Sequence, residues 1–355
     1  MCVWQESKPI LVLKPMTIRS IRVVLNSTNP IPLLRILAKS VTITDFELNG
    51  NNMVVLDSRR QALMQVFKSG FHIARGTFRN STKDGVVVRS IEGSPSITGG
   101  VLRYLIGTLN NRDVVSLTTL DGGKTITKNI VVENIRAYGS RDRGAVEISD
   151  GVEDMFVRNV YAIDCYYAVS IQDHGVSELE TIRRVFVSNV VAVRSDFAIV
   201  SQVESIRHGD VSTSRVFAKN CIKALELQNL DWVRVDDVRV IAPRTTGYAL
   251  EIINCKDLKI RDVSFVGGGK ARGAIMVMQS SNVRIAGVTV DRSSNFHFGI
   301  SVFKKNRETQ SGFQISQVDL AAVKRQEIQV ADIPPHWAAL LWGGKRGPSG
   351  RSETT

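Results

Sequence analysis

Two short patterns of alternating apolar and polar residues recur through most of the chain. The first pattern opens with a small residue, and its copies are AVEISD from Ala145, AVSIQD from Ala168, AIVSQV from Ala198, ALELQN from Ala224, ALEIIN from Ala249, AIMVMQ from Ala274 and GISVFK from Gly299. Alternation with a period of two, together with many Val and Ile residues, is typical of β-strands. The first pattern therefore predicts one short strand in each repeating unit of about 25 residues.

The second pattern has the form V-x-I-x, then Asn or Asp, then V-x-V. Its copies are IVVENIRA from Ile130, FVRNVYA from Phe156, VFVSNVVAV from Val185, VRVDDVRV from Val233, LKIRDVSF from Leu258 and VRIAGVTV from Val283. We interpret it as two strands joined at the polar residue, because a short polar side chain tolerates the left-handed backbone of a tight bend. We expect the following residues to stack as a ladder in one turn: Asn134, Asn159, Asn189, Asn220, Asp237 and Asp262.

The repeats predict an all-β solenoid of about ten coils, in which each coil contacts only its neighbours. We place this domain at residues 1–330 and a C-terminal cap with a flexible tail at residues 331–355. The segment PPHWAALLW, from Pro334 to Trp342, is apolar enough to cover the last coil, whose strand edges would otherwise be unpaired.

On these repeats the sequence resembles the right-handed parallel β-helix of the pectin-lyase-like superfamily, over roughly Pro9 to Leu320. The resemblance implies that the first pattern forms the first sheet, beside which a sugar-binding cleft lies. It also implies a lyase, epimerase, hydrolase or binding-only tailspike, and a secreted or periplasmic protein. The opening MCVWQESKPI shows no secretion signal, although a mature or trimmed start would look the same.

The net charge of the chain narrows the classes of ligand that we expect it to bind. Lys and Arg number 46 against 34 Asp and Glu, which gives a formal net charge of +12 and favours an anionic ligand. No nucleic-acid motif accompanies this charge, and no apolar stretch approaches the roughly 20 residues of a membrane helix. The four cysteines have no CxxC spacing, so they indicate neither a zinc site nor a disulfide framework. The charge alone leaves a nucleic acid, an acidic polysaccharide or an acidic membrane surface as partners. Together with the family resemblance it favours an acidic polysaccharide, and DNA binding is a third option that rests on charge alone.

The alternation predicts which side chains face outward from the first sheet. Val146 and Ile148 point inward, so one outward column contains Glu147, Ser170, Val200, Glu226, Glu251, Met276 and Ser301. The adjacent column contains Ser149, Gln172, Gln202, Gln228, Ile253, Met278 and Phe303. We expect Glu147 and the three glutamines to bind substrate.

Glu226 and Glu251 occupy the same position in successive coils, about 4.8 Å apart along the stack. Such a pair is the arrangement that acid–base catalysis of glycoside hydrolysis needs. Alternatively, a basic neighbour neutralises both carboxylates.

Asp173, His174 and Arg207 are expected at the rim of the cleft as catalytic residues for uronate chemistry. A His beside a carboxylate removes a proton next to the uronate carboxyl group, and a cation stabilises the resulting anion. Asp173-His174 resembles part of the Asp-Pro-His signature of mannuronan epimerases, without the proline. The alternative is a polar turn with an Asp–His hydrogen bond.

Cations precede most strands of the first pattern. Arg143, Arg194, Lys223 and Arg244 are expected to form a basic lip along the cleft, with Tyr166 and Tyr167 as an aromatic pair for sugar rings. The alternative is a solvated loop face. Asp150 and Asp154 are candidate ligands of Ca²⁺, which the resemblance allows, or else parts of a polar turn.

Together these features favour a carbohydrate-active enzyme on a uronate-containing polysaccharide, of lyase or C5-epimerase type. The alternatives are a glycoside hydrolase that uses the Glu pair and a non-catalytic, tailspike-like glycan-binding protein. In the lower coils, Ile253, Met276, Met278 and Phe303 would form an outward apolar patch that needs a cover. The cover is either the C-terminal segment with Trp337, Leu340, Leu341 and Trp342 or another subunit, so the protein is a monomer or a homo-oligomer through these coils.

Overall fold

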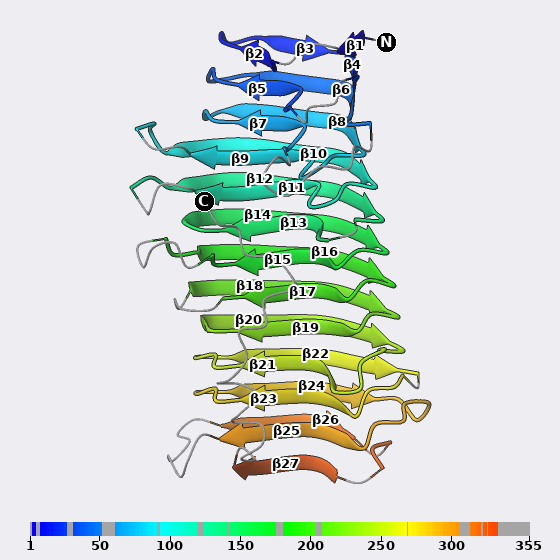
Figure 1. Ribbon diagram of the computed structural model, residues 1–355. Helices are drawn as coiled ribbons and strands as arrows, with labels where there is room; N and C mark the ends of the chain where they lie inside the picture. Colours follow the sequence, from blue (N-terminus) through cyan, green and yellow to red (C-terminus); the bar gives the residue numbers. More distant parts are fainter. Residues whose placement is uncertain are drawn as a thin grey trace.

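Two parallel β-sheets run alongside each other down one solenoid (Figure 1). The computed structural model describes residues 2–4, 8–26, 31–51, 61–90, 93–119, 124–140, 142–174, 180–203, 208–267, 269–304, 313–320, 322–324 and 326–332. These residues contain strands and no helix, so none of their segments is a helix that would cross a membrane.

The first sheet has thirteen strands within the described residues. They are β2 (Ile10–Val12), β5 (Leu34–Ile36), β7 (Met64–Val66), β9 (Val86–Ser90), β11 (Val115–Thr119), β13 (Gly144–Ser149), β15 (Tyr167–Gln172), β17 (Phe197–Gln202), β19 (Lys223–Gln228), β21 (Tyr248–Ile253), β23 (Gly273–Met278), β25 (Phe298–Lys304) and β27 (Gln326–Asp332). Every copy of the first pattern is one of these strands. β27 crosses the boundary predicted after residue 330, and residues 333–355 lie outside the described part of the chain.

The second sheet has fourteen strands within the same residues. They are β1 (Cys2–Trp4), β3 (Thr17–Arg19), β4 (Arg22–Leu25), β6 (Thr42–Asn49), β8 (Phe71–Arg79), β10 (Ile97–Thr108), β12 (Thr127–Tyr138), β14 (Val152–Ile163), β16 (Arg183–Val193), β18 (His208–Lys219), β20 (Leu230–Ile241), β22 (Lys259–Val266), β24 (Arg284–Val290) and β26 (Gln314–Asp319). All pairs are parallel, so the predicted right-handed parallel β-helix is confirmed.

The second pattern forms continuous bent strands rather than two separate ones. Asn134, Asn159 and Asn189 have φ angles of 57°, 58° and 54° and occupy the bend of β12, β14 and β16. The side-chain amide of Asn159 donates to Asn134 Oδ1 at 3.1 Å, and that of Asn189 donates to Asn159 Oδ1 at 2.8 Å. The expected ladder is confirmed for these three residues.

The expectation for Asn220 is wrong. Val190 pairs with Val216, so Arg215, with a φ of 54°, is the next residue of the ladder after Asn189. Asp237 and Asp262 then continue it, because Val216 pairs with Val238 and Val238 with Val263. Asn220 lies beyond the end of β18, in a different turn. The inward apolar positions fix the register of β18, and the cost of a left-handed Arg does not override them.

Apolar side chains from both sheets form one core that extends along the described coils. The lower coils also bury apolar residues on the outside of the first sheet. Met276, Met278 and Phe303 have the predicted outward register, and they pack with Tyr248 in a cluster separate from the core. The tail residues proposed as their cover, Trp337 among them, lie outside the described residues.

Candidate functional site

The register of the first sheet places the expected polar residues on its outer face. Glu147 pairs with Ser170, Ser170 with Val200, and Val200 with Glu226. Glu226 pairs in turn with Glu251, as the alternation predicted. Outward orientation does not mean exposure here, because the loops before and after these strands fold over several of the side chains.

Glu147 is 1% exposed and accepts hydrogen bonds from several side chains. Arg112 Nη2 and the Ser116 hydroxyl donate to Glu147 Oε2, each at 3.2 Å, and Arg143 Nη1 donates to Oε1 at 3.4 Å. Burial alone would raise the pKa of Glu147, but the two guanidinium groups outweigh it and lower the pKa to about 2. Glu147 is therefore a buried carboxylate that stays ionised.

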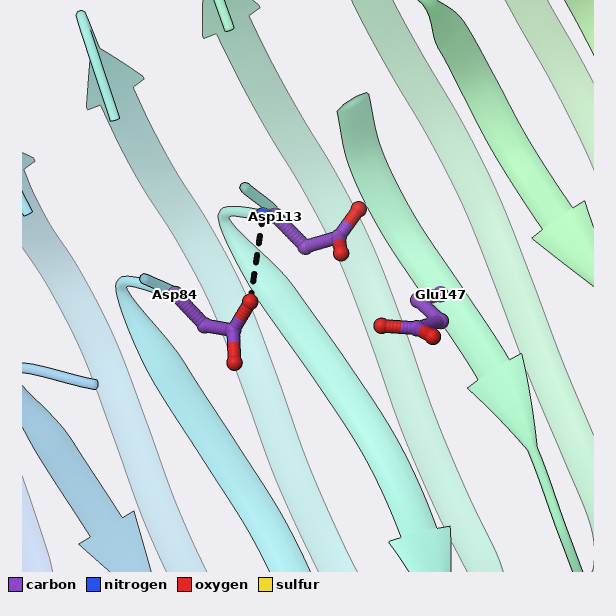
Figure 2. Close-up of side chains that lie close together, drawn as sticks. All are labelled: Asp84, Asp113 and Glu147. Carbon is purple, nitrogen blue, oxygen red and sulfur yellow. Dashed lines mark hydrogen bonds between the residues drawn. The ribbon is translucent and has the colours of Figure 1, made fainter. Parts of the chain in front are cut away.

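Asp84 and Asp113 lie beside Glu147, and Figure 2 shows the three carboxyl groups turned toward one another. The backbone amide of Asp113 donates to Asp84 Oδ1 at 3.3 Å, and that of Gly144 donates to Asp113 Oδ1 at 3.2 Å. One oxygen from each of the three carboxyl groups lies within 4.8 Å of the others. Burial, reinforced by Glu147 and Asp84, raises the pKa of Asp113 well above its usual value, so the negative charge on Asp113 is disfavoured.

Our sequence analysis missed Asp84 and Asp113. A signal was present, because Lys83-Asp84 and Arg112-Asp113 stand at the same place before two successive strands of the first sheet, β9 and β11. These strands belong to the weaker upstream repeats, and the outward columns that we followed began only at Glu147.

This carboxyl cluster does not fit a Ca²⁺ ion. Arg112 contacts Glu147 at 3.2 Å and lies 3.6 Å from Asp84, so its positive charge occupies the position that a cation would need. The raised pKa of Asp113 disfavours the negative charge that a Ca²⁺ ligand needs. Nor are the expected ligands Asp150 and Asp154 brought together: Asp150 binds His174, and Asp154 binds Arg184 through both carboxylate oxygens, at 2.5 and 3.1 Å.

Asp150 orients His174. The backbone amide of His174 donates to Asp150 Oδ1 at 2.9 Å, and its Nδ1 lies 2.5 Å from Asp150 Oδ2. His174 Nε2 lies 3.8 Å from Glu147 Oε1, and the imidazole remains 41% exposed. Burial would lower the pKa of His174, but the hydrogen bond and charge of Asp150 outweigh it and raise the pKa.

His174 pairs with Asp150 and not with Asp173, the partner that the alternative of a polar turn would have given it. Asp173 lies 3.8 Å from His208 Nε2, and both of these side chains are buried. His174 thus meets a residue of the preceding coil, whereas Asp173 meets one of the following coil. Arg207, the third expected rim residue, lies outside the described residues.

Amide side chains extend the site across three coils. Arg143 donates to Gln172, Gln172 Nε2 donates to Gln202 Oε1 at 3.2 Å, and Gln202 Nε2 donates to the Tyr166 hydroxyl at 3.3 Å. Gln172 is buried, whereas Gln202 and Tyr166 are partly exposed. This hydrogen-bonded row links Glu147 to the coil of Tyr166.

Tyr167 is not the exposed sugar platform that we expected. It is fully buried, packs with Phe197 and Val200, and has a hydroxyl without a hydrogen-bond partner. A Cβ at position 144 would lie 1.8 Å from the carbonyl oxygen of Tyr167, so Gly144 makes this packing possible.

Lys223 neutralises the predicted Glu pair. Its ammonium group binds both Glu226 and Glu251, at 2.6 Å from Glu251 Oε2. The expectation of a repelling acid–base pair is therefore corrected to its alternative, a pair held by a basic neighbour. Gln228, at the end of the same strand, donates its backbone amide to the Ser201 hydroxyl at 2.6 Å.

The expected basic lip does not form a free stripe. Arg194 binds both carboxylate oxygens of Asp164 at 2.8 and 2.7 Å. Arg244 lies 3.6 Å from Asp196 and donates to the carbonyl oxygen of Ser195 at 3.2 Å. Like Arg143 and Lys223, both cations are engaged by acceptors of the chain itself.

Comparisons with known proteins address the fold. No family model matches the sequence, and no curated protein matches it. Among solved structures, the N-terminal fragment of bacteriophage phi29 gene product 12 is 12% identical and has a TM-score of 0.72, with 93% of this chain and 65% of that chain covered. The pre-mature form of the same gene product is 11% identical, with a TM-score of 0.65 and coverage of 91% and 52%.

The periplasmic alginate epimerase AlgG is 11% identical and has a TM-score of 0.49, with 94% of this chain and 78% of that chain covered. Of the two phage chains, this chain covers 65% of the length of the N-terminal fragment and 52% of the length of the pre-mature form. Identities this low establish architecture and not activity. The chain therefore has the parallel β-helix fold, with two parallel sheets along one solenoid.

Proposed function

We propose that this protein is a secreted or periplasmic carbohydrate-active enzyme that acts on uronate-containing polysaccharides as a lyase or C5-epimerase. The observation that carries the proposal is the half-exposed imidazole of His174, which Asp150 orients beside the ionised Glu147. An imidazole held at one nitrogen and open at the other is suited to proton transfer.

In the proposed reaction, neutral His174 removes the proton from carbon 5 of the uronate through Nε2. The electron pair of that C–H bond moves into the carboxyl group and forms an enediolate. In a lyase, this pair then forms the double bond between carbons 4 and 5 as the bond from carbon 4 to the glycosidic oxygen breaks. In an epimerase, a water molecule protonates carbon 5 on the opposite face, and the imidazolium of His174 later returns its proton to solvent. Asp150 stabilises the imidazolium formed in the first step.

Arg143 is the proposed partner of the substrate carboxylate. Its side chain is 20% exposed, at the edge of the buried cluster, and it contacts both Glu147 and Gln172. Burial raises the pKa values of Asp84 and Asp113, which disfavours negative charge on both residues. With His174 neutral, the guanidinium groups of Arg112 and Arg143 face the carboxylates of Glu147 and Asp150. Arg143, at the edge of the cluster, is the cation that an anionic group of a substrate reaches.

The test is to incubate the protein with polygalacturonate and alginate. Ultraviolet absorbance of an unsaturated product identifies a lyase, and a changed ratio of C5 epimers in the NMR spectrum identifies an epimerase. We expect His174→Gln to lower kcat at least a hundredfold, with His297→Gln as the matched control. A fully active His174→Gln variant contradicts the proposed role.

A second candidate is a non-catalytic glycan-binding protein. It is favoured by Lys223, which occupies the space between Glu226 and Glu251 and leaves that pair unsuited to hydrolysis. A reducing-sugar assay separates the cases: new reducing ends without an unsaturated product indicate a hydrolase, and binding without any product indicates a binding protein.

A further inference from the structure

Three cations form a column on the outer face of the second sheet, away from the first-sheet residues described above. Arg234 of β20 pairs with Lys259 of β22, which pairs with Arg284 of β24. We call these three residues the basic column. Successive members stand about 4.8 Å apart along the solenoid, because each belongs to the next coil.

The basic column is exposed, and none of the described residues that line its groove is acidic. Its three side chains line a groove of about 430 Å³ together with Arg261, and Gln314 and Ser316 line its far end. Arg261 is held by Asp236 at 2.7 Å. Among the described residues, no ion pair holds Arg234, Lys259 or Arg284. Like charges at this spacing repel one another and gain free energy from an anionic ligand.

Exposed aromatic rings continue the same face toward the upper coils. Phe156 and Phe186 precede Arg234 in the same register, with Ser212 between, and their rings stack at a centroid distance of 5.2 Å. Trp232 lies beside Arg234 and is 66% exposed. Large apolar rings left in water at one end of a charged groove are typical of a binding surface.

We propose that the basic column and these aromatic residues bind an anionic polysaccharide chain that lies along the solenoid axis. The anionic groups of the chain pair with the basic column, and its sugar rings pack on Trp232, Phe186 and Phe156. Asp210 and Asp257 line the hollow around Trp232 together with Arg234 and Lys259, so the charges balance there and the aromatic end accepts uncharged parts of a ligand. A glycan that carries charge on only some units fits this arrangement better than a nucleic acid, which carries a phosphate at every nucleotide.

The test compares two variants that lose the same charge. The first combines Arg234→Ala, Lys259→Ala and Arg284→Ala. The control combines Arg136→Ala, Lys219→Ala and Arg239→Ala, three exposed cations beyond the bend of the same sheet. Binding of polygalacturonate in which part of the carboxyl groups is methyl-esterified, of neutral dextran and of a single-stranded oligo-dT is measured by titration calorimetry at several salt concentrations.

We expect the first variant to bind polygalacturonate at least tenfold more weakly than wild type, with a weaker dependence on salt. The control variant should lose less than threefold. Trp232→Ala should weaken binding several-fold without changing the salt dependence. Equal losses in the two triple variants, or no loss in the first, would overturn the proposal, as would tighter binding of oligo-dT than of polygalacturonate by the wild-type protein.

The proposal shares with the proposed function only its class of ligand, and the two fail separately. If the triple variant binds as wild type while His174→Gln is inactive, the basic column is not a binding site and the proposed function stands. If binding depends on the basic column and no reaction is found, the proposed function fails alone.

Discussion

The carboxyl group of Asp113 faces the carboxylate of Glu147 within 4.8 Å, and the pKa values of the two groups are shifted in opposite directions. Arg112 and Arg143 hold the charge on Glu147, and burial beside that charge keeps the proton on Asp113. The folded chain therefore binds a proton that the unfolded chain releases near pH 3.8. Stability from this group is present below that pH and is lost as the pH rises toward the folded pKa.

The first prediction concerns Asp113→Asn, which imitates the protonated acid. The variant keeps the oxygen that accepts the Gly144 amide and has no proton to lose. Relative to wild type, its melting temperature should rise by several degrees between about pH 4 and pH 8, because one pKa unit corresponds to about 1.4 kcal/mol. Thermal unfolding across this range is the measurement, with the exposed Asp237→Asn as control. A difference from wild type that does not change with pH would show that Asp113 is ionised.

The second prediction concerns the pH dependence of the proposed reaction. Because His174 must be neutral to accept a proton, activity should increase as the pH rises through its pKa, which lies above the usual 6.5. Asp150→Asn removes the group that raises this pKa and should shift the rising limb to lower pH. The pH profiles of kcat for both proteins provide the check. If the rising part of the pH profile of Asp150→Asn lies at the same pH as that of wild type, a group other than His174 is the base.

The third prediction concerns Lys223→Met, which leaves Glu226 and Glu251 adjacent without their shared cation. The three side chains are at most about a quarter exposed, so we expect a loss of about 2 kcal/mol, between the values for surface and buried pairs. Adding Glu226→Gln and Glu251→Gln should recover most of it. Urea unfolding of both variants measures the effect. Lys223→Met with wild-type stability would show that the bridge contributes nothing.

The fourth prediction concerns Gly144, over which Tyr167 packs. Gly144→Ala places a Cβ 1.8 Å from the carbonyl oxygen of Tyr167, which only a backbone shift relieves, so we expect a loss of about 3 kcal/mol or more. Gly209→Ala is the matched control, because no atom lies within 4 Å of its Cβ. Chemical denaturation distinguishes the two. Equal free energies of unfolding for Gly144→Ala and Gly209→Ala would mean that the backbone at Tyr167 shifts at little cost.

The fifth prediction concerns the bend ladder. Asn159→Ala loses the hydrogen bonds to Asn134 and Asn189 and replaces a residue that tolerates the left-handed backbone with one that does so less well, so it should cost about 2 kcal/mol. Asn159→Gly removes the same hydrogen bonds without the backbone strain and should cost less. If calorimetry finds Asn159→Gly less stable than Asn159→Ala, the left-handed backbone at residue 159 does not determine which residue is stable there.

The sequence alone predicted the fold and most of the register, because an alternation of period two fixes which face each residue occupies. The outward positions of Glu147, Glu226 and Glu251 follow from this rule. Asn220 was misplaced because we counted from the nearest Asn, whereas the inward valines of β18 place Arg215 in the bend.

The candidate site was predicted less completely, since its contacts come from loops that follow no period. Asp150 and His174 are 24 residues apart and meet only because neighbouring coils stack, which no local pattern reveals. In the same way, we predicted Lys223 and Arg143 as cations of a lip along the cleft. The directions of their side chains, which bring them over the first sheet, depend on the turns before the strands, and the repeat pattern does not specify these turns. The basic column lies on the second sheet, whose outer face we had not followed.

The regular register of the basic column also bears on how such a surface changes in length. Each added coil contributes one rung of about 4.8 Å to every column, so duplication of a single repeat would lengthen the groove by one side chain and leave the existing rungs intact. The contact between Asp150 and His174 would be lost if the extra repeat were inserted between β13 and β15, because the two residues would then no longer lie on neighbouring coils. The groove on the second sheet can therefore lengthen with the number of coils and so match a longer polymer. The site on the first sheet depends on one pair of neighbouring coils, those of Asp150 and His174.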